Sequence, residues 1–130
     1  MHNPIEEWVE ISEYDLLTAK AMLDSGRYLY VAFMCQQALE KLLKAYYAFV
    51  RNELPPRTHN LLYLIDILKL IPETDALSFL AVLNQFYIET RYPGERLALA
   101  RTLDSKKSKE FMEKTQELWS WLRNQLPSNK

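Results

Sequence analysis

The chain has 130 residues, 48% of them hydrophobic and 25% charged, which is enough for one domain with a buried core and argues against long disordered segments. Its formal net charge of −1 excludes a bulk positive field that would attract nucleic acid, so contact with RNA or nucleotides needs a local cluster. One cysteine excludes an intramolecular disulfide, and the sequence shows neither a signal peptide nor a membrane-length apolar run. We expect a single cytoplasmic domain over residues 1–130, with its core at about 4–126.

The first predicted helix covers residues 4–25. Asn3 can cap it, and Pro4 fits the first helical position. Gly26 is available for a left-handed conformation just after its end. Apolar residues recur at helical spacing and predict the buried side: Ile5, Trp8, Val9, Leu16, Ala19, Met22 and Leu23.

The second predicted helix begins at Tyr28 and carries an apolar seam that continues to Val50. This length predicts that the helix is central to the fold and that Cys35 is buried within it. The pair Pro55-Pro56 is expected to end the helix, because proline cannot continue the backbone hydrogen bonding.

Three more helices complete the prediction. Thr58 is expected to cap the third, which ends before Pro72. The fourth covers about 75–91 and is stopped by Pro93-Gly94, and a looser segment follows it. The last runs from about 104 to 126, with Asp104 or Ser105 as its cap, and the tail 127–130 is expected to fray. The third helix should bury one stripe: Leu61, Leu64, Ile65, Leu68 and Ile71.

These elements predict an all-α fold, namely an up-and-down antiparallel bundle of about five helices. The sequence contains no glycine-rich phosphate loop, no Cys-x-x-Cys pair and no His-Glu-x-x-His motif. His2 and His59 are the only histidines, so we expect neither a metal site nor a cofactor.

Polar residues interrupt the second helix and have two interpretations. They are Gln36, Gln37, Glu40, Lys41 and Lys44. Either they form the solvated side of an amphipathic helix, or this side meets another surface, because the surrounding residues are strongly apolar.

Arg57 and His59 precede the third predicted helix and also have two interpretations. They are exposed residues of a helix entry, or they lie at a helix N-terminus where backbone amides favour an anion such as phosphate. Arg91 falls at the end of the fourth predicted helix, where exposed carbonyl groups favour any cation. That explains Arg91 alone and leaves the sequence Arg91-Tyr92-Pro93 open.

Three segments together resemble the HEPN domain, which is named for higher eukaryotes and prokaryotes nucleotide-binding. They read QQALEKLLKAYY at 36–47, PPRTHNLLYLI at 55–65 and TRYP at 90–93. The resemblance covers about residues 7–121 and implies a helical bundle that often dimerises. It also implies a neighbouring minimal nucleotidyltransferase as a frequent partner.

Many members of this family are metal-independent ribonucleases, whose motif is an arginine, four to six further residues and a histidine. Arg91 matches the arginine, but positions 96–98 hold Arg96, Leu97 and Ala98. His59 does not restore the spacing from Arg51 or Arg57. An arginine cannot serve as a base near neutral pH, so the motif is incomplete.

Three hypotheses follow. The first is a non-catalytic binding module for a partner protein and a nucleotide or RNA phosphate. Its ligand-binding residues would be Arg91, Tyr92, Lys41, Lys44, Arg57 and His59. The second is a divergent, toxin-like ribonuclease that uses Arg91 with His59 brought in from elsewhere in the fold.

The third hypothesis is a purely structural helical dimer. We expect a homodimer, because the resemblance implies one and because this short chain has a surplus of large apolar residues, including Tyr46, Tyr47, Phe86 and Tyr87.

Overall fold

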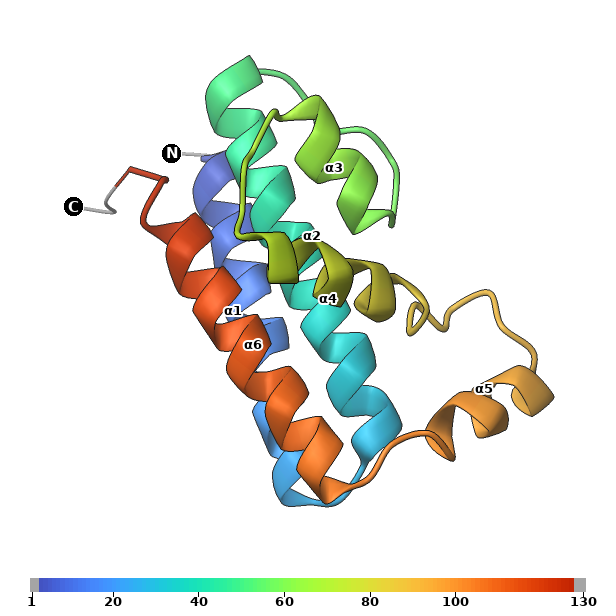
Figure 1. Cartoon of the computed structure of the whole chain (residues 1–130). Coiled ribbons are helices and arrows are strands. Elements are labelled where there is room, and N and C mark those ends of the chain that lie inside the picture. The colour runs from blue at the N-terminus through green and yellow to red at the C-terminus, as the bar shows by residue number, and fades with distance from the viewer. Residues whose placement is uncertain (1–2, 128–130) are drawn as a thin grey trace.

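The computed structural model describes residues 3–127, so His2 and most of the predicted fraying tail lie outside the described part. Six α-helices and no strand occur in residues 3–127 (Figure 1). Their bounds are α1 Pro4–Asp24, α2 Tyr28–Arg51, α3 Leu61–Ile67, α4 Thr74–Asn84, α5 Pro93–Ala100 and α6 Ser105–Arg123. The all-helical class is confirmed, whereas the expected count of five misses α5.

Helix α2 lies at the centre of the fold and contacts each of the other five helices. Val31, Cys35, Leu39 and Leu42 on this helix are all buried, as predicted from its long apolar seam. Burial raises the pKa of the Cys35 thiol to about 12, which keeps the group protonated near neutral pH. Cys35 is therefore a core residue and not a nucleophile.

The three long helices α1, α2 and α6 pack side by side, and the three short ones cover one side of them (Figure 1). Helix α1 runs antiparallel to α2, but α6 runs in the same direction as α2, and α4 crosses both (Figure 1). The arrangement therefore departs from simple up-and-down alternation. The crossover is made by the segment from α3 to α5, which returns the chain to the end of the bundle where α2 begins.

The ends of the first two helices show how local sequence fixes them. Gly26 has a φ of 76°, and the amide of Arg27 donates to the Met22 carbonyl, so the expected left-handed cap of α1 is confirmed. Helix α2 ends at Arg51, before Pro55-Pro56. Its stop is Asn52, which adopts a left-handed conformation with a φ of 52°. Asparagine tolerates this backbone better than most residues, and the prolines were the wrong stop signal.

Asn60 caps α3, and the prediction of Thr58 is wrong. The Asn60 side-chain oxygen accepts hydrogen bonds from the amides of Leu62 and Tyr63. Thr58 instead accepts from the amide of Asn60, so it orders the residue that forms the cap. Helix α3 also ends earlier than expected, at Ile67, which leaves Ile71 outside the helix and 89% exposed.

The fourth helix ends at Asn84 instead of residue 91. Phe86 and Ile88 are both buried although they are two residues apart, a spacing that no single face of a helix can satisfy. The chain therefore leaves the helix and proceeds through turns. Pro93 then occupies the first position of α5, where its missing amide costs nothing, so this proline starts a helix instead of stopping one.

Asp104 caps α6 by accepting from the amide of Lys107, which confirms that prediction. Two aromatic residues that suggested a surplus for dimerisation, Tyr47 and Phe86, are buried within this chain. The apolar residues left exposed are different ones and include Ile11, Tyr14 and Leu17. Among the described residues, no helix has the length and apolar character needed to span a membrane.

Candidate functional site

Glu40 lies on the buried side of α2 and is the centre of a polar cluster. Its carboxylate accepts from the Lys44 ammonium at 3.1 Å and from the Gln36 side-chain amide at 3.2 Å. Lys44 is one turn further along the helix, its side chain is only 9% exposed, and its ammonium lies 5.8 Å from the Trp8 ring centroid. Because the two charges cancel, the pair can be buried without leaving a net charge in the interior.

His59 reaches this cluster from the loop between α2 and α3. Its Nδ1 lies 3.1 Å and 3.3 Å from the two Glu40 oxygens, and its backbone carbonyl accepts from the Gln36 side chain at 2.8 Å. Since a carboxylate can only accept, the hydrogen bond places a proton on Nδ1 and leaves Nε2 on the other side of the ring. The side chain is 49% exposed, so the ring is anchored at one nitrogen and accessible elsewhere.

Tyr87 connects His59 to the segment between α4 and α5. The two rings stack at a centroid distance of 4.1 Å, and the Tyr87 hydroxyl donates to Glu89. Burial and this hydrogen bond raise the pKa of Tyr87, so its hydroxyl stays protonated near neutral pH. Arg91 donates from Nε to the Tyr87 carbonyl at 3.1 Å and from a terminal nitrogen to the Gln85 carbonyl at 2.8 Å. Arg91 thus holds the turn that presents Tyr87.

We name Glu40, Lys44, His59, Tyr87 and Arg91 the His59 cluster. It includes three of the residues singled out from the sequence as ligand-binding and lies where α2, the loop before α3 and the segment after α4 meet. The cluster holds the His59 imidazole in a fixed orientation, next to a turn that the Arg91 guanidinium stabilises. An imidazole in this position can donate or accept a hydrogen bond with a ligand.

Lys41 lies on a separate branch of hydrogen bonds that reaches the cluster from α1. It donates to the Gln37 side chain at 3.0 Å and lies 3.5 Å from a carboxylate oxygen of Asp15, while Gln37 donates to Gln36 at 2.7 Å. Burial raises the pKa of Asp15, although Lys41 opposes this effect. Gln36, Gln37 and Glu40 are all buried, so this side of α2 meets another surface and is not solvated.

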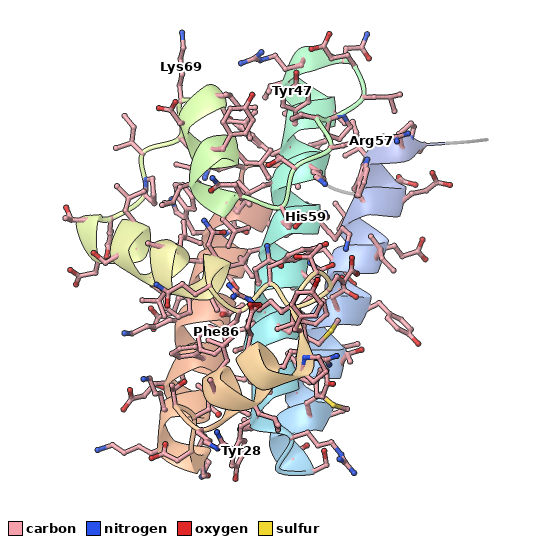
Figure 2. All side chains as sticks on the ribbon, turned by 90° about the vertical axis from the view of Figure 1, so that its right-hand side faces the viewer. Tyr28, Tyr47, Arg57, His59, Lys69 and Phe86 are labelled. Atoms are coloured by element: carbon pink, nitrogen blue, oxygen red, sulfur yellow. The ribbon has the colours of Figure 1, made fainter. Side chains whose placement is uncertain are left out.

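The structure does not bring the other predicted residues into the cluster. Tyr92 is 78% exposed and follows Arg91 into α5. Arg57 is exposed and lies above His59 in Figure 2, toward the end of the molecule that holds Tyr47. His59 precedes α3 by two residues and bonds to Glu40, and the amides of Leu62 and Tyr63 in the first turn of α3 donate to the Asn60 side chain.

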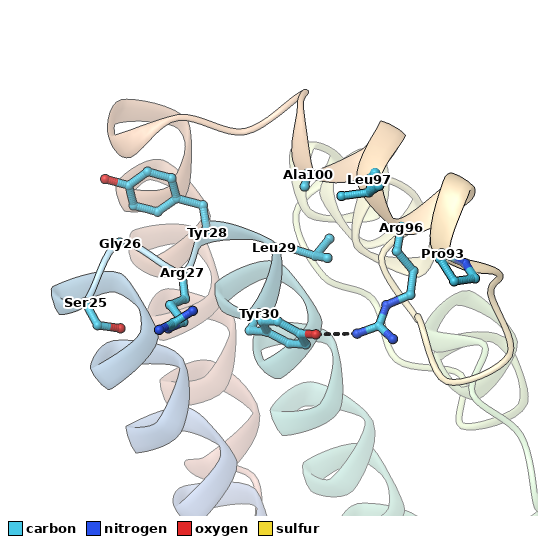
Figure 3. Close-up of a pocket in the computed structure, with 10 residues that line it drawn as sticks. All are labelled: Ser25, Gly26, Arg27, Tyr28, Leu29, Tyr30, Pro93, Arg96, Leu97 and Ala100. Atoms are coloured by element: carbon cyan, nitrogen blue, oxygen red, sulfur yellow. Dashed lines mark hydrogen bonds between the residues drawn. The ribbon is translucent and has the colours of Figure 1, made fainter.

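A groove of about 780 Å³ lies between α5 and the turn that begins α2 (Figure 3). We name it the α5 groove; it is lined in part by Arg27, Tyr30, Pro93, Arg96 and Leu97. Arg96 donates to the Tyr30 hydroxyl, and its guanidinium carbon lies 5.7 Å from the Tyr30 ring centroid. Arg91 and Tyr92, which the sequence suggested as ligand-binding residues, do not line this groove.

Sequence reasoning missed the role of Tyr87 and the pairing of Tyr30 with Arg96. The apolar pattern assigns Tyr87 to the buried face of a longer fourth helix, and no local pattern marks its stacking on His59. Tyr30 and Arg96 are 66 residues apart, so only the tertiary fold joins them. The spacing of Glu40 and Lys44 was visible in the sequence, because an i,i+4 pair of opposite charges is typical of an ion pair on a helix. No group of three His, Cys, Asp or Glu side chains within residues 3–127 is placed to hold a metal ion.

Comparisons with known proteins agree on the fold. The crystal structure of TT1696 from Thermus thermophilus is 27% identical with a TM-score of 0.76, over 96% of this chain and 100% of that one. The crystal structure of ST0689, an archaeal HEPN homologue, is 23% identical with a TM-score of 0.74, over 95% and 98% of the two chains. No curated protein matches the sequence.

The same result comes from the sequence of the whole chain. The model of the HEPN domain family matches residues 5–125, which include all six helices except the first residue of α1. The match therefore includes both the His59 cluster and the α5 groove. With this match, the chain belongs to the HEPN domain family.

Proposed function

We propose that this protein is a non-catalytic HEPN binding module that holds a nucleotide or an RNA phosphate at the His59 cluster. The observation that carries the proposal is the placement of His59, which is fixed by buried Glu40 and stacked on Tyr87 while half of its side chain remains exposed. Because the imidazole is already held in place, its side chain loses little conformational entropy when a ligand binds. Tyr92, exposed two residues before Gly94, would provide a further ring for stacking.

The absence of catalysis rests on the residue that replaces the histidine of the cleaving relatives. Arg96 stands at that spacing from Arg91 and donates to Tyr30. A guanidinium holds phosphate well but stays protonated near neutral pH, so it cannot take up a proton from a 2′-hydroxyl. Binding is therefore retained in this proposal while general acid–base catalysis is lost.

A second candidate is the divergent, toxin-like ribonuclease, and one observation favours it. The bond from His59 Nδ1 to Glu40 orients the imidazole as a general base would require, with Nε2 as the free acceptor. Arg91 is linked to the same cluster through the Tyr87 carbonyl. The two candidates share their residues and differ only in whether the imidazole exchanges a proton with RNA.

A cleavage and binding assay separates the candidates. Purified protein is incubated with mixed RNA substrates without added metal, and binding of the same RNAs is measured at several salt concentrations. We expect no efficient cleavage, and weaker, less salt-dependent binding for Arg91→Ala, because one phosphate contact is lost. Robust cleavage that disappears in both Arg91→Ala and His59→Ala would instead establish the ribonuclease.

The conservative variant Arg91→Lys makes the binding result interpretable. Arg91 also donates hydrogen bonds to two carbonyls of its own turn. A lysine keeps the positive charge but cannot reproduce this pair of hydrogen bonds. Binding that is retained by Arg91→Lys and lost in Arg91→Ala assigns the effect to charge. Equal binding by wild type and Arg91→Ala would remove Arg91 from the ligand site.

The assembly that we propose is a cytoplasmic homodimer paired with a minimal nucleotidyltransferase. The support for the dimer is the exposed apolar stripe of Ile11, Tyr14 and Leu17 on α1, on the side of that helix opposite its buried residues. The support for the nucleotidyltransferase is membership of the HEPN family, in which such partners are frequent.

A further inference from the structure

The α5 groove has an unusual balance of charge for this protein. Two of the residues that line it are arginines, Arg27 and Arg96, and none is acidic. The whole chain has a net charge of −1, so the groove is a local positive site on a nearly neutral molecule. A concave surface with two guanidinium groups favours an anionic ligand, because the cavity walls exclude part of the screening solvent.

The Tyr30 ring lies between the two arginines (Figure 3). Arg96 donates to the Tyr30 hydroxyl, and its guanidinium carbon is 5.7 Å from the ring centroid. The guanidinium thus lies beside the Tyr30 hydroxyl and within cation–π distance of the ring. Tyr30 is 37% exposed, so a planar group that enters the groove can stack on it.

Arg27 supplies a guanidinium that the fold does not use. It is exposed, and within residues 3–127 it has no acidic partner. Arg96 has donors left after its bond to Tyr30, since a guanidinium carries five N–H groups. Arginines bind phosphate with paired hydrogen bonds, and a ligand with several phosphate oxygens could engage both side chains.

The volume of the groove favours a ligand larger than a simple anion. Its volume of about 780 Å³ falls within the range of about 300–1,000 Å³ that is typical of small-molecule sites and far exceeds the needs of a bare phosphate. We propose that the α5 groove binds a nucleoside phosphate, with the base on Tyr30 and the phosphate on Arg27 and Arg96. This inference rests on the proposed function for its ligand class but assigns the ligand to a place outside the His59 cluster.

The same nucleoside phosphate could be a free mononucleotide or one residue of an RNA chain. Calorimetric titration of the full chain at low salt should therefore use four probes: AMP, adenosine, inorganic phosphate and an oligoadenylate of about eight residues. We expect AMP or the oligoadenylate to bind more tightly than adenosine or phosphate, because only these probes engage both the ring and the arginines. Binding of AMP identifies a free nucleotide as the source, and binding of the oligomer alone identifies RNA.

Substitutions then locate the site. The double variant Arg27→Gln, Arg96→Gln should weaken binding of the preferred probe about tenfold or more, because charge-assisted hydrogen bonds are lost. Tyr30→Leu should weaken it about fivefold or more through lost stacking, and Tyr30→Phe, which keeps the ring, should lose less. The matched control is Arg101→Gln, an exposed arginine at the end of α5 that does not line the groove. Thermal melting of each variant checks that the fold is intact.

The outcomes distinguish this inference from the proposed function. Affinity that is unchanged in the double variant and in Tyr30→Leu, but reduced in Arg91→Ala and His59→Ala, overturns the α5 groove and leaves the His59 cluster as the site. Phosphate that binds as tightly as AMP overturns the nucleoside assignment. No binding of any probe by the wild type contradicts both proposals.

Discussion

Glu40 holds a charge inside the bundle, and three donors from three directions compensate it. Lys44 and Gln36 approach along the same helix, and His59 approaches from the loop before α3. Buried carboxylates are tolerated only when such partners are present, since desolvation of an unpaired charge costs several kcal/mol. The position of His59 therefore depends on a residue that no ligand needs to touch.

Replacement of Glu40 should lower the stability of the protein. Glu40→Ala leaves the Lys44 ammonium buried without its counter-charge, so we expect the free energy of unfolding to fall by about 3–5 kcal/mol. Urea denaturation measures this loss. Glu13→Ala, an exposed carboxylate on α1, is the control and should change stability by no more than about 0.5 kcal/mol. A Glu40→Ala variant as stable as the control would show that the pair is not stabilising.

At this scale the sequence singled out three of the five residues of the His59 cluster as ligand-binding: Lys44, His59 and Arg91. The spacing of Glu40 and Lys44 and the isolated His59 were visible in it, because both follow from chain order. The contact between His59 and Glu40 could not be predicted, because it depends on how the loop at 52–60 returns to α2. Stacking of Tyr87 on His59 requires the early end of α4, which depends in turn on burial of Phe86 and Ile88.

Among the helices, proline and capping residues explain both the correct predictions and the wrong ones. Asn3, Gly26 and Asp104 act as their types suggest, since each needs only the backbone of its own helix end. Pro93 is ambiguous in sequence, because proline is compatible with the first position of a helix and with the residues after one. The early end of α4 at Asn84, which accompanies burial of Phe86 and Ile88, leaves Pro93 free to begin α5.

The cap of α3 gives a direct test at the scale of the element. Asn60→Ala should lower the free energy of unfolding by about 1 kcal/mol, within a range of about 0.5–2 kcal/mol, because two amides lose their acceptor. The same substitution also removes the hydrogen bond that the Asn84 side-chain amide donates to Asn60, which should add to the loss of stability.

Thr58→Ala is the matched comparison for this variant. It removes one hydrogen bond to the amide of Asn60 but leaves the cap in place, so its effect on urea denaturation should be smaller. A larger loss for Thr58→Ala than for Asn60→Ala would restore Thr58 as the residue that starts α3.

The whole molecule buries many of its aromatic residues and leaves one helix face apolar. The all-helical class and the central α2 could be predicted because hydrophobic periodicity is a property of the local sequence. The exposed stripe of α1 could not, because Tyr14 and Leu17 are apolar in sequence and only the packed fold shows which side of the helix stays uncovered. The proposed dimer would cover this stripe.

A charge placed in the stripe should therefore separate the subunits. We expect light scattering to give a dimer mass for the wild type at micromolar concentration and a monomer mass for Tyr14→Glu, Leu17→Glu, because an uncompensated carboxylate would be buried in a two-fold contact. The control is Ile71→Glu, which charges an exposed apolar residue elsewhere. A wild type that is monomeric, or a dimer that tolerates both α1 substitutions, would contradict this interface.

Helix α5 differs from the other five in having no buried residue. Leu99 packs partly against the core, and Arg96 bonds to Tyr30 on α2. Segments with few buried contacts open with a free energy well below that of global unfolding, so the α5 groove would exist as a population of closed and open states. The apparent affinity of any groove ligand is then the intrinsic affinity multiplied by the fraction of molecules in the closed state. Substitutions that only tighten α5 against α2 would strengthen binding without touching the ligand.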